Sequence, residues 1–442
     1  MTPTHEVTNQ VPPLIDYDAA EYAPLLEALQ REGASDALEE VHQVGIRAGS
    51  AQAQEWGDLA EEHPPVLRTH DRYGNRIDEV RYDPAYHQLM STAVELGLHG
   101  APWVDPNPHA HLVRAAKMAV WGQTDAGHGC PISMTYAVIP ALRHNADLAA
   151  QYEPLLTTRH YDSALKAPLT KPGLIAGMSM TEKQGGSDVR AGTTRAVPQS
   201  DGSYLLTGHK WFTSAPMSDV FLVLAQAPGG LSCFFLPRVL PDGSLNNMYL
   251  QRLKDKLGNH SNASSEVEYL DALAWMVGEE GRGVRTIIEM VNMTRLDCAT
   301  ASAAVMRNGT TAAAHHANYR SAFGAKLVDQ PLMRNVLADL HVDAEASTLT
   351  ALWLADLTDR AMRDERAAQL RRISLAISKY FICKRAPMHA AEALECLGGN
   401  GYVEDSRMPR LFRESPLMSI WEGSGNVAAL DTLRAIGREP QT

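Results

Sequence analysis

Several signatures of common folds and sites are missing from this sequence. No two cysteines form a CxxC pair; they are Cys130, Cys233, Cys298, Cys383 and Cys396. Their wide spacing argues against a disulfide framework and against a structural zinc site, so we predict no metal. No apolar run approaches the roughly 20 residues that span a bilayer, and the N-terminus lacks the regions of a signal peptide. These absences predict a cytoplasmic protein without membrane partners.

The sequence also has no excess of positive charge. Lysine and arginine total 40 against 52 aspartate and glutamate residues, for a net charge of −12. Binding to nucleic-acid phosphates needs clustered basic residues, so the acidic balance argues against a nucleic-acid partner. The best candidate cluster runs from Arg360 to Arg372, but Asp359, Asp364 and Glu365 interrupt it. We interpret it as a solvated helix face.

Three regions of the chain differ in their hydrophobic pattern. From about residue 17 to 170, apolar residues recur three or four apart, which is the helical period. From about 177 to 277, short β-rich runs alternate with turn dipeptides, and residues 220–237 read as a hairpin. Beyond residue 281 the helical pattern returns. We expect an apolar stripe there to pack between the helices of a bundle; it consists of Ile373, Ile377, Tyr380 and Phe381.

Two glycine-containing motifs are candidates for ligand binding. No GxxxxGK[ST] phosphate loop is present, and residues 397–402 (LGGNGY) follow a helical run instead of the strand that a dinucleotide fingerprint requires. These glycines favour a helix C-terminus and turn, although glycine also lets a backbone approach a ligand closely. Residues 180–189 (MTEKQGGSDV) offer backbone amides and hydroxyls that suit phosphate oxygens or the edge of a heterocycle. An ordinary polar loop would have the same composition.

Two further motifs contain aromatic residues. In residues 211–214 (WFTS), two aromatic side chains could cover one face of a flat ring while two hydroxyls donate to its edge. A buried strand is the simpler interpretation. In residues 421–426 (WEGSGN), Glu422 stands between an aromatic residue and a glycine. Partial desolvation makes such a carboxylate a better base near neutral pH, although most glutamates merely lie on the surface.

Taken in order, these motifs resemble the signatures of the acyl-CoA dehydrogenase family. Two more stretches add to the resemblance, the end of the β region (KLG at 256–258 with VGEEG at 277–281) and RSAFG at 320–324. Within the family the AidB branch, a group of alkylation-response flavoproteins, is most similar. Its likeness rests on residues 180–189, GHKWF at 208–212, RLKDKLGN at 252–259 and PRLFRE at 409–414. AidB proteins carry a further basic domain implicated in DNA binding, which we expect these residues to lack because they stop at Thr442. Either the sequence is shortened or this relative has no such domain, and both options argue against DNA binding by these residues.

The resemblance implies an α+β fold of the acyl-CoA dehydrogenase type. Its parts would be an N-terminal helical domain (1–176), a central β-barrel or sandwich (177–277) and a C-terminal four-helix bundle (278–442). It also implies FAD as the cofactor. The residues at the matching positions are Met180, Thr181, Gly186, Ser187, Trp211, Thr213, Arg320, Phe323, Gln330, Gly398, Gly399, Ser424 and Asn426.

By the same resemblance these residues have different roles. Thr181 would meet the pyrimidine edge of the flavin and Ser187 the pyrophosphate, while Trp211 and Thr213 would cover the ring and donate near N5 and O4. Ser424 and Asn426 would contact the adenosine half. Five residues would reach the FAD of a neighbouring subunit, which implies a homotetramer; they are Arg320, Phe323, Gln330, Gly398 and Gly399. Glu395 departs from the family, which often has Gln there, so that adenine contact is in doubt.

The resemblance assigns Glu422 as the catalytic base and Arg295 as a substrate-binding residue. Some members of the family place the base at the position of Thr294, which cannot act as one. The implied reaction is α,β-dehydrogenation of an acyl thioester of coenzyme A or of a carrier protein. Glu422 takes the α proton, its N–H polarises the carbonyl, and flavin N5 accepts the hydride. Either an electron-transfer flavoprotein or oxygen could then accept the electrons.

Two alternatives remain open at this stage. One is an AidB-like flavoprotein with a nucleic-acid-binding or protective role and only weak dehydrogenase activity. The other is an oxidase or monooxygenase on the same fold. The acidic balance of the chain argues against the first, and the intact glutamate of the WEG motif argues against the second.

Overall fold

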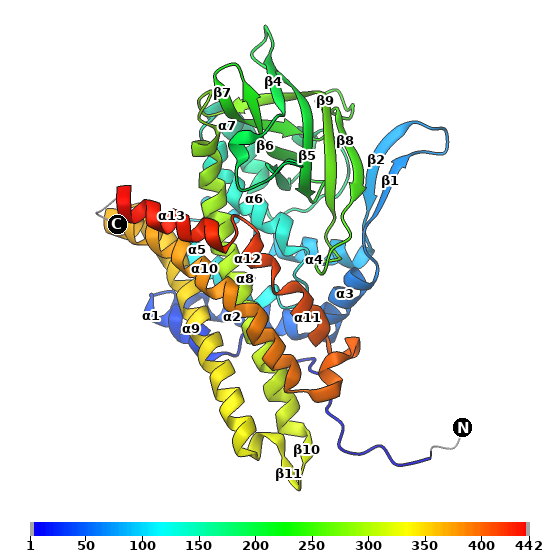
Figure 1. Ribbon diagram of the computed structural model, residues 1–442, viewed down its shortest axis with the longest axis vertical. Helices are drawn as coiled ribbons and strands as arrows, with labels where there is room; N and C mark the ends of the chain where they lie inside the picture. Colours follow the sequence, from blue (N-terminus) through cyan, green and yellow to red (C-terminus); the bar gives the residue numbers. More distant parts are fainter. Residues whose placement is uncertain (1–3, 439–442) are drawn as a thin grey trace. The chain divides into compact units, whose positions relative to one another are not determined.

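The computed structural model describes residues 4–438, which divide into two compact units. One, called here the β unit, comprises residues 55–117 and 124–297. The other, called the helical unit, comprises 4–54, 118–123 and 298–438 of the described residues. Figure 1 traces the chain through both in sequence colours. The two-unit division does not test the three predicted domains, which stay a prediction.

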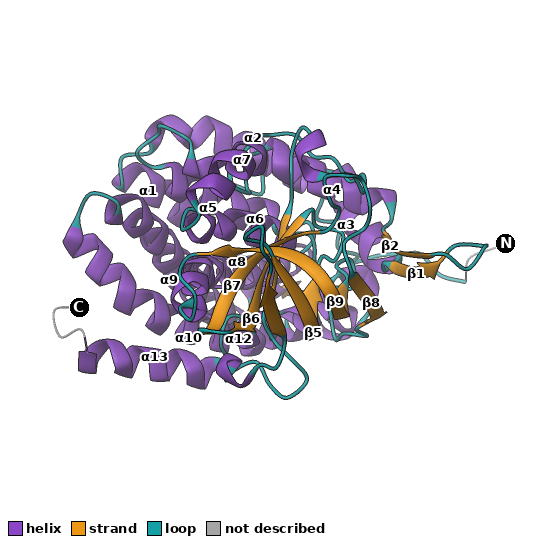
Figure 2. Cartoon of the chain, turned by 90° about the horizontal axis from the view of Figure 1, so that it is seen from above, coloured by secondary structure: helices purple, strands orange, loops and turns teal. Residues whose placement is uncertain are grey.

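The β unit is built around a closed sheet. Strand β6 pairs with β4 and with β7, β4 with β5, and β9 with both β5 and β7, so these five strands form a ring. The sheet is completed by β3, which pairs in parallel with β6, and by β8, which pairs with β9. Figure 2 shows these strands in orange. The strands are β3 (Ala176–Ser179), β4 (Arg195–Pro198), β5 (Tyr204–Ser214), β6 (Val220–Ala227), β7 (Gly230–Pro237), β8 (Met248–Leu253) and β9 (Ser264–Val277).

The barrel forms because its strands carry long apolar runs with tight turns between them. Phe221, Phe234, Leu250 and Val267 are among the fully buried side chains of its core. The predicted hairpin is confirmed, since β6 pairs with β7 in the register that joins Ala227 to Gly230. The central β-barrel of the predicted fold is therefore confirmed as well.

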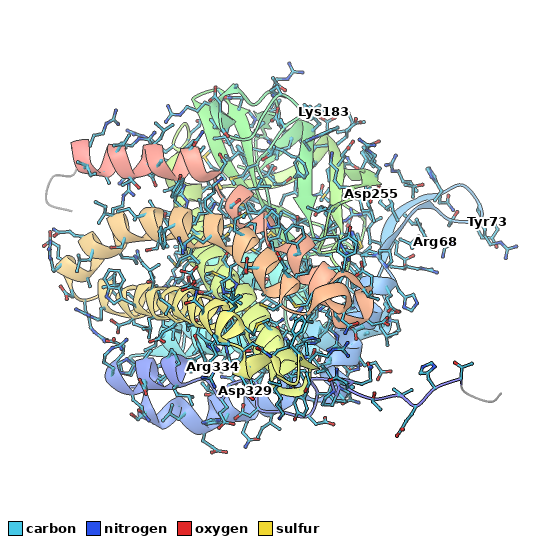
Figure 3. The ribbon with its side chains drawn as sticks, turned by 60° about the horizontal axis from the view of Figure 1, so that its bottom comes forward. Arg68, Tyr73, Lys183, Asp255, Asp329 and Arg334 are labelled. Carbon is cyan, nitrogen blue, oxygen red and sulfur yellow. The ribbon has the colours of Figure 1, made fainter. Side chains whose placement is uncertain are left out.

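A second hairpin in the β unit was not predicted. Strands β1 (Val66–His70) and β2 (Arg76–Arg81) pair within a region that we had expected to be mainly helical. The Asp71 carboxylate accepts hydrogen bonds from the amides of Tyr73 and Asn75, and Gly74 adopts a φ of 86°. Such Asx and glycine chemistry builds a turn from local contacts. Figure 3 labels Arg68 and Tyr73 on this hairpin.

Helices make up the rest of the β unit. They are α4 (Pro84–Glu95), α6 (Gly129–Leu142), α7 (Ala146–Leu156) and the short 3₁₀ segments η2 (Ala101–Trp103), η3 (Pro168–Thr170) and η4 (Val189–Ala191). Three helices contribute residues to both units, namely α3 (Ala51–Glu62), α5 (Ala110–Trp121) and α8 (Gly283–Tyr319).

The helical unit contains the long C-terminal helices. α10 packs against α9 and α13, and α1 packs against α9. The elements are α1 (Ala23–Arg31), η1 (Ser35–Ala37), α2 (Leu38–Gly49), β10 (Ser321–Ala322), β11 (Ala325–Lys326), η5 (Leu327–Asp329), α9 (Pro331–Ala361), α10 (Glu365–Glu395), η6 (Gly398–Tyr402), η7 (Glu404–Ser406), α11 (Met408–Glu414), α12 (Leu417–Ile420) and α13 (Gly425–Arg438). The predicted C-terminal helical bundle is confirmed.

The ends of α10 follow from its sequence. At the start, the Asp364 carboxylate accepts a hydrogen bond from the amide of Arg366, as expected of an N-cap. At the other end Gly398 adopts a φ of 60°, the left-handed conformation in which helices commonly end. The interpretation of the first glycines of LGGNGY as a helix terminus and turn is thus confirmed.

The prediction that the apolar stripe on α10 is core was wrong. Ile377, Tyr380 and Phe381 are 47%, 41% and 54% exposed in the single chain, while Ile373 is half-buried. The neighbouring face of α10, with Leu375 and Ile382, is buried instead. Helical periodicity identifies an apolar face but does not say whether the same chain covers it. An exposed apolar face of this kind is typical of a surface that another molecule covers.

No helix of the described residues is both long enough and apolar enough to cross a membrane.

Candidate active site

The loop after β3 contains the first predicted flavin motif. It begins at Met180 and folds back against β5, because the amide of Trp211 donates to the carbonyl of Thr181 at 2.8 Å. A Cβ at Gly186 would lie 2.7 Å from the Thr181 hydroxyl oxygen, so only glycine fits there. The structure therefore brings Met180, Thr181 and Gly186 next to Trp211, while Ser187 is exposed further along the loop.

A buried ion pair anchors this loop. Lys210 and Glu182 are 1% and 2% exposed, and the Lys210 ammonium lies 3.0 Å from a Glu182 carboxylate oxygen. Lys210 also donates to the carbonyls of Leu224 and Met180, and Glu182 accepts from the amides of Thr193 and Thr194. Burial opposes ionisation of Glu182, but these hydrogen bonds and the Lys210 charge outweigh it and hold its pKa well below its usual range.

We expect Glu182→Gln to lower the free energy of unfolding by about 3 kcal/mol at pH 7, because it leaves the Lys210 ammonium buried without its partner charge. A carboxyl with a depressed folded-state pKa stabilises fully above its unfolded value, here 4.5, and the contribution is lost as the pH falls below it. Urea unfolding at several pH values should therefore show the largest difference between wild type and variant near neutrality. A difference that grew toward acid would contradict this assignment.

The second flavin motif lies on β5. Three cationic side chains surround the Trp211 ring. The Lys254 ammonium lies 3.2 Å from the ring centroid, the Lys183 ammonium 5.6 Å and the central carbon of the Arg252 guanidinium 5.8 Å. The Thr213 side chain is fully buried, and its hydroxyl lies 2.5 Å from that of Ser179. Trp211 thus presents an aromatic face within a positive field, whereas the Thr213 hydroxyl is already engaged in the single chain.

Two predicted cofactor glycines, Gly398 and Gly399, and Gly185 beside the predicted Gly186 show where the main chain is open to a ligand. A Cβ at Gly185, Gly398 or Gly399 would meet no atom of the chain within 4 Å. At all three positions the main chain is therefore open to an approaching group, as expected where a backbone contacts a ligand. Within the β unit, the open main chain at Gly185, the hydroxyl of Thr181 and the face of Trp211 fit a group that carries a flat heterocycle.

Glu422 lies in the tight loop that joins α12 to α13. It has a φ of 56°, and Gly423, the next residue, has a φ of 92°. A non-glycine residue in the left-handed region costs about 1–3 kcal/mol, and such strain gathers at functional sites. Ser424 and Asn426 follow at the start of α13, where a Cβ at Gly425 would lie 3.1 Å from the Tyr380 ring. The three predicted residues are therefore brought together around one loop.

Arg320, Phe323 and Gln330 gather at a short hairpin. Phe323 and Gly324 form its two-residue turn, both with positive φ, as a type I′ turn requires. The Phe323 side chain is 101% exposed. The Gln330 amide donates to the Ala322 carbonyl at 3.1 Å, and the Arg320 guanidinium to the Asn9 carbonyl at 2.5 Å. The hairpin thus presents an aromatic side chain entirely outside the single chain.

The cofactor residues of the helical unit form two groups. Leu327 and Val328 beside the hairpin pack against the same buried cluster as Leu397, next to Gly398. The Glu422 loop lies instead against Lys379, 16 residues before the end of α10 at Glu395. At 1.5 Å per residue this separation is about 24 Å along the helix. The hairpin group and the Glu422 group are therefore distinct places on one unit.

The residues on α8 are buried. Thr294 is 4% exposed, and its hydroxyl donates to the carbonyls of Met290 and Val291 in the preceding turn. Such bonds leave it no role as a base. Arg295 is 5% exposed, so its substrate-binding role stays a prediction.

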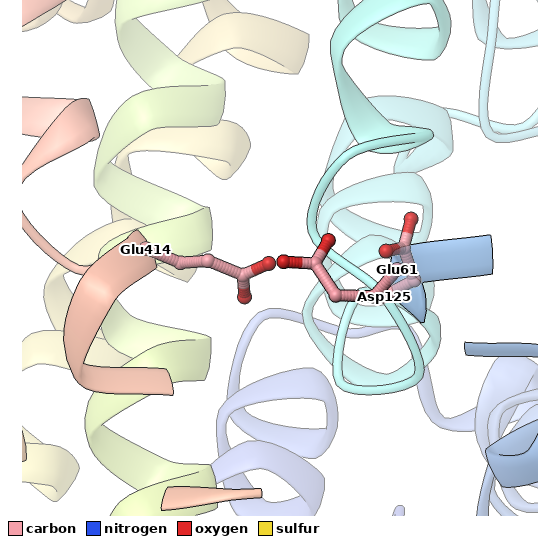
Figure 4. A group of neighbouring side chains, drawn as sticks. All are labelled: Glu61, Asp125 and Glu414. Carbon is pink, nitrogen blue, oxygen red and sulfur yellow. The ribbon is translucent and has the colours of Figure 1, made fainter. Parts of the chain in front are cut away.

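Glu61 and Asp125 are two buried carboxylates of the β unit. Their carboxylate oxygens lie within 4.8 Å of each other (Figure 4). The Ser261 hydroxyl donates to Asp125 at 2.8 Å, and the Ser261 amide to Glu61 at 3.2 Å. His128 and His260 lie 3.0 and 2.9 Å from Asp125 and Glu61. These contacts join the loop at residues 259–262 to α3 and to the loop before α6, which gives both acids a structural role.

Sequence reasoning missed three elements of the site. The Glu182–Lys210 pair joins positions that are far apart in the chain, and no local pattern reports such a contact. The cations around Trp211 had one available signal, the alternation of Arg252 and Lys254 at the end of β8 and just beyond it. Lys379 lies within a helical segment, and no local sequence pattern predicts its contacts with the Glu422 loop.

The fold and the site define a class of flavin-dependent dehydrogenase, and the comparisons agree. Residues 9–163 match the family described as the adaptive response protein AidB N-terminal domain. Residues 177–272 and 281–437 match the middle and C-terminal domains of acyl-CoA dehydrogenase. The chain belongs to the acyl-CoA dehydrogenase family, in its AidB branch, and is an FAD-dependent oxidoreductase of that type.

The relatives support this placement. The chain is 47% identical to AidB of Escherichia coli K12 over 99% of its own length and 81% of that protein. Its fold matches ACDH-11 of Caenorhabditis elegans in complex with C11-CoA, with a TM-score of 0.91, 29% identity and coverage of 99% and 76% of the two chains. The apo form of Bd2924 also gives a TM-score of 0.91, at 30% identity, with 98% and 88% covered. The predicted family and cofactor are thus confirmed.

Proposed function

We propose that the protein catalyses α,β-dehydrogenation of an acyl thioester with Glu422 as the base. The observation that carries the proposal is the conformation of the WEG loop, in which Glu422 is held at a φ of 56° directly after Trp421. The loop stands at the family's C-terminal signature, and the rival position, Thr294, has its hydroxyl bonded to its own helix.

Each residue has a defined task in this proposal. The Glu422 carboxylate takes the α proton, and its backbone N–H is one donor to the thioester carbonyl. A donor to a developing oxyanion is among the strongest contributions an enzyme makes. Trp211 excludes water from the reacting centre, and Arg295 contributes to substrate binding. When bound, FAD supplies the acceptor for the hydride that leaves the β carbon.

We take an acyl-CoA as the first substrate to test. The ACDH-11 structure holds C11-CoA, and the similarity to that chain extends over 99% of this one. This supports coenzyme A as the carrier and an acyl chain of intermediate length, with a carrier-protein thioester as the alternative. The electron acceptor is either an electron-transfer flavoprotein or oxygen.

We further propose that the working form is a homotetramer with shared FAD sites. The hairpin group and the Glu422 group lie about 24 Å apart along α10, which suits contacts with two different FAD molecules. The fully exposed Phe323 and the exposed stripe of Ile377, Tyr380 and Phe381 offer apolar surface for neighbouring copies.

A nucleic-acid-binding role in the alkylation response is the second candidate, favoured by the 47% identity to AidB. The arginine cluster between Arg360 and Arg372 gives this candidate little support. Arg360 pairs with Asp356 and Asp364, and Arg372 pairs with Asp431. We expect no shift of duplex DNA at moderate salt by this chain, and a specific shift under those conditions would favour the second candidate.

The proposed function is tested by anaerobic titration of the holoenzyme with a panel of saturated acyl-CoA thioesters of increasing length, with the matching carrier-protein thioesters alongside. We expect the flavin absorbance to bleach, fastest with acyl groups of intermediate length. Failure of every thioester to bleach the bound flavin would overturn the proposal.

A further inference from the structure

Lys379 is a buried lysine that contacts the loop containing Glu422. It lies on α10 and is 1% exposed. Its ammonium donates to the carbonyls of Gly423 at 2.6 Å, Trp421 at 2.7 Å and Ser419 at 3.4 Å. Three alternate carbonyls of one short segment thus converge on a single positive charge.

The contact with Trp421 bears directly on Glu422. The Trp421 carbonyl and the Glu422 N–H belong to the same peptide group, which is trans, as are all peptide bonds of the described residues. In a planar trans peptide the C=O and N–H point in opposite directions. Fixing the carbonyl toward Lys379 therefore fixes the N–H on the other side of the loop.

The charge of Lys379 adds a second effect. A hydrogen bond from an ammonium is stronger than one from a neutral donor, and hydrogen bonds in series polarise one another. An ammonium bonded to the Trp421 oxygen draws electron density from the amide, which makes the Glu422 N–H a stronger donor. The same ammonium holds the Gly423 carbonyl, and so restrains Glu422 on both sides in its left-handed conformation.

We propose that Lys379 is a positioning residue for the reaction, which aims and polarises the Glu422 N–H toward the thioester carbonyl. The inference rests on the proposed function, because it assumes that this N–H binds the carbonyl. The competing view is that Lys379 only satisfies three buried carbonyls. That view predicts loss of stability without any effect on a bound thioester.

The first test needs no substrate. Amide hydrogen exchange of the FAD-loaded protein is compared for wild type, Lys379→Met and Lys171→Met. Lys171 is a matched control, since it is also buried and its ammonium lies 2.6 Å from Asp219 in the other unit. We expect faster exchange over residues 419–425 in Lys379→Met alone. Unchanged exchange there, or an equal increase in Lys171→Met, would overturn the proposal.

The second test uses the carbonyl of a bound thioester. Glu422→Gln keeps its substrate unreacted, so the infrared stretch of a ¹³C-labelled acyl-CoA carbonyl can be recorded in the FAD-loaded variant and in Glu422→Gln/Lys379→Met. We expect the stretch to be lowered in the single variant and to return toward its solution value in the double variant. The same frequency in both would overturn the proposal.

Rates separate this inference from the function on which it rests. We expect Lys379→Met alone to slow flavin bleaching at saturating acyl-CoA by about tenfold or more, with little change in the concentration that half-saturates the rate. If Glu422→Gln slows bleaching but Lys379→Met does not, this inference fails and the proposed function stands. If Glu422→Gln bleaches at the wild-type rate, both fail.

If Lys379→Met does not fold, Lys379→Arg is the second variant to test. Lys379→Arg keeps the charge but presents its donors as a planar fork, which does not match three convergent carbonyls. We therefore expect Lys379→Arg to fold, with faster exchange at residues 419–425 and slower bleaching. Wild-type behaviour in both measurements would overturn the proposal.

Discussion

Replacing Glu422 by glutamine is expected to leave FAD bound and to slow reduction of the flavin by acyl-CoA by about 10²–10⁴-fold, the range that a positioned general base contributes. Glutamine has nearly the same shape but cannot accept the α proton. The backbone N–H stays in place, so binding of the thioester should change little. Stopped-flow bleaching under anaerobic conditions, with flavin content measured on the same sample, gives the result.

A matched control is Glu365→Gln. Glu365 is an exposed glutamate at the first position of α10, and we assign it no part in the site. This variant should bleach as fast as wild type. Bleaching of Glu422→Gln at the wild-type rate would show that Glu422 is not the base, because glutamine cannot accept the α proton.

Replacing Phe323 by aspartate is expected to dissociate the oligomer and to lower FAD occupancy. The side chain is 101% exposed in the single chain, so the substitution removes no internal packing and should change the stability of the isolated fold by no more than about 0.5 kcal/mol. If Phe323 is buried against the FAD and surface of a neighbouring copy, a charge placed there must be desolvated, which is costly. Light scattering and the ratio of flavin to protein absorbance report both effects.

Tyr73→Asp is the control for the hairpin substitution. Tyr73 is an aromatic residue at the turn of another hairpin and is 76% exposed. It should keep both the oligomer and the flavin. A Phe323→Asp protein with full flavin content in an intact tetramer would contradict the shared-site proposal.

The fold was predictable where the sequence carries its information locally. The β6–β7 hairpin follows from two apolar runs around a Pro-Gly turn, and the end of α10 follows from Gly398. The β1–β2 hairpin was missed because its strands are short and half-exposed, so they lack a long apolar run. The stripe of Ile377, Tyr380 and Phe381 was misassigned because an apolar helix face has the same sequence pattern whether it packs against its own chain or against another molecule.

The site was predictable only in part, and for a similar reason. The motifs around Trp211 and Glu422 are contiguous, so the sequence could single them out. The groups that hold them are not contiguous, since Lys210 reaches Glu182 across 28 residues and Lys379 reaches Trp421 across 42. Such contacts exist only once the chain has folded. Similarity to a family predicts the reacting groups, and the structure adds the buried charges that contact the loops containing them.

The central claim is that Glu422 takes the α proton of an acyl thioester while the bound flavin is reduced. The most direct test is a single anaerobic turnover of FAD-loaded wild-type protein with an acyl-CoA of intermediate length, in which bleaching and product are measured in one sample. We predict that the flavin bleaches while an equal amount of α,β-unsaturated acyl-CoA forms, and that Glu422→Gln yields neither. Bleaching without unsaturated product, or equal yields from both proteins, would contradict the account.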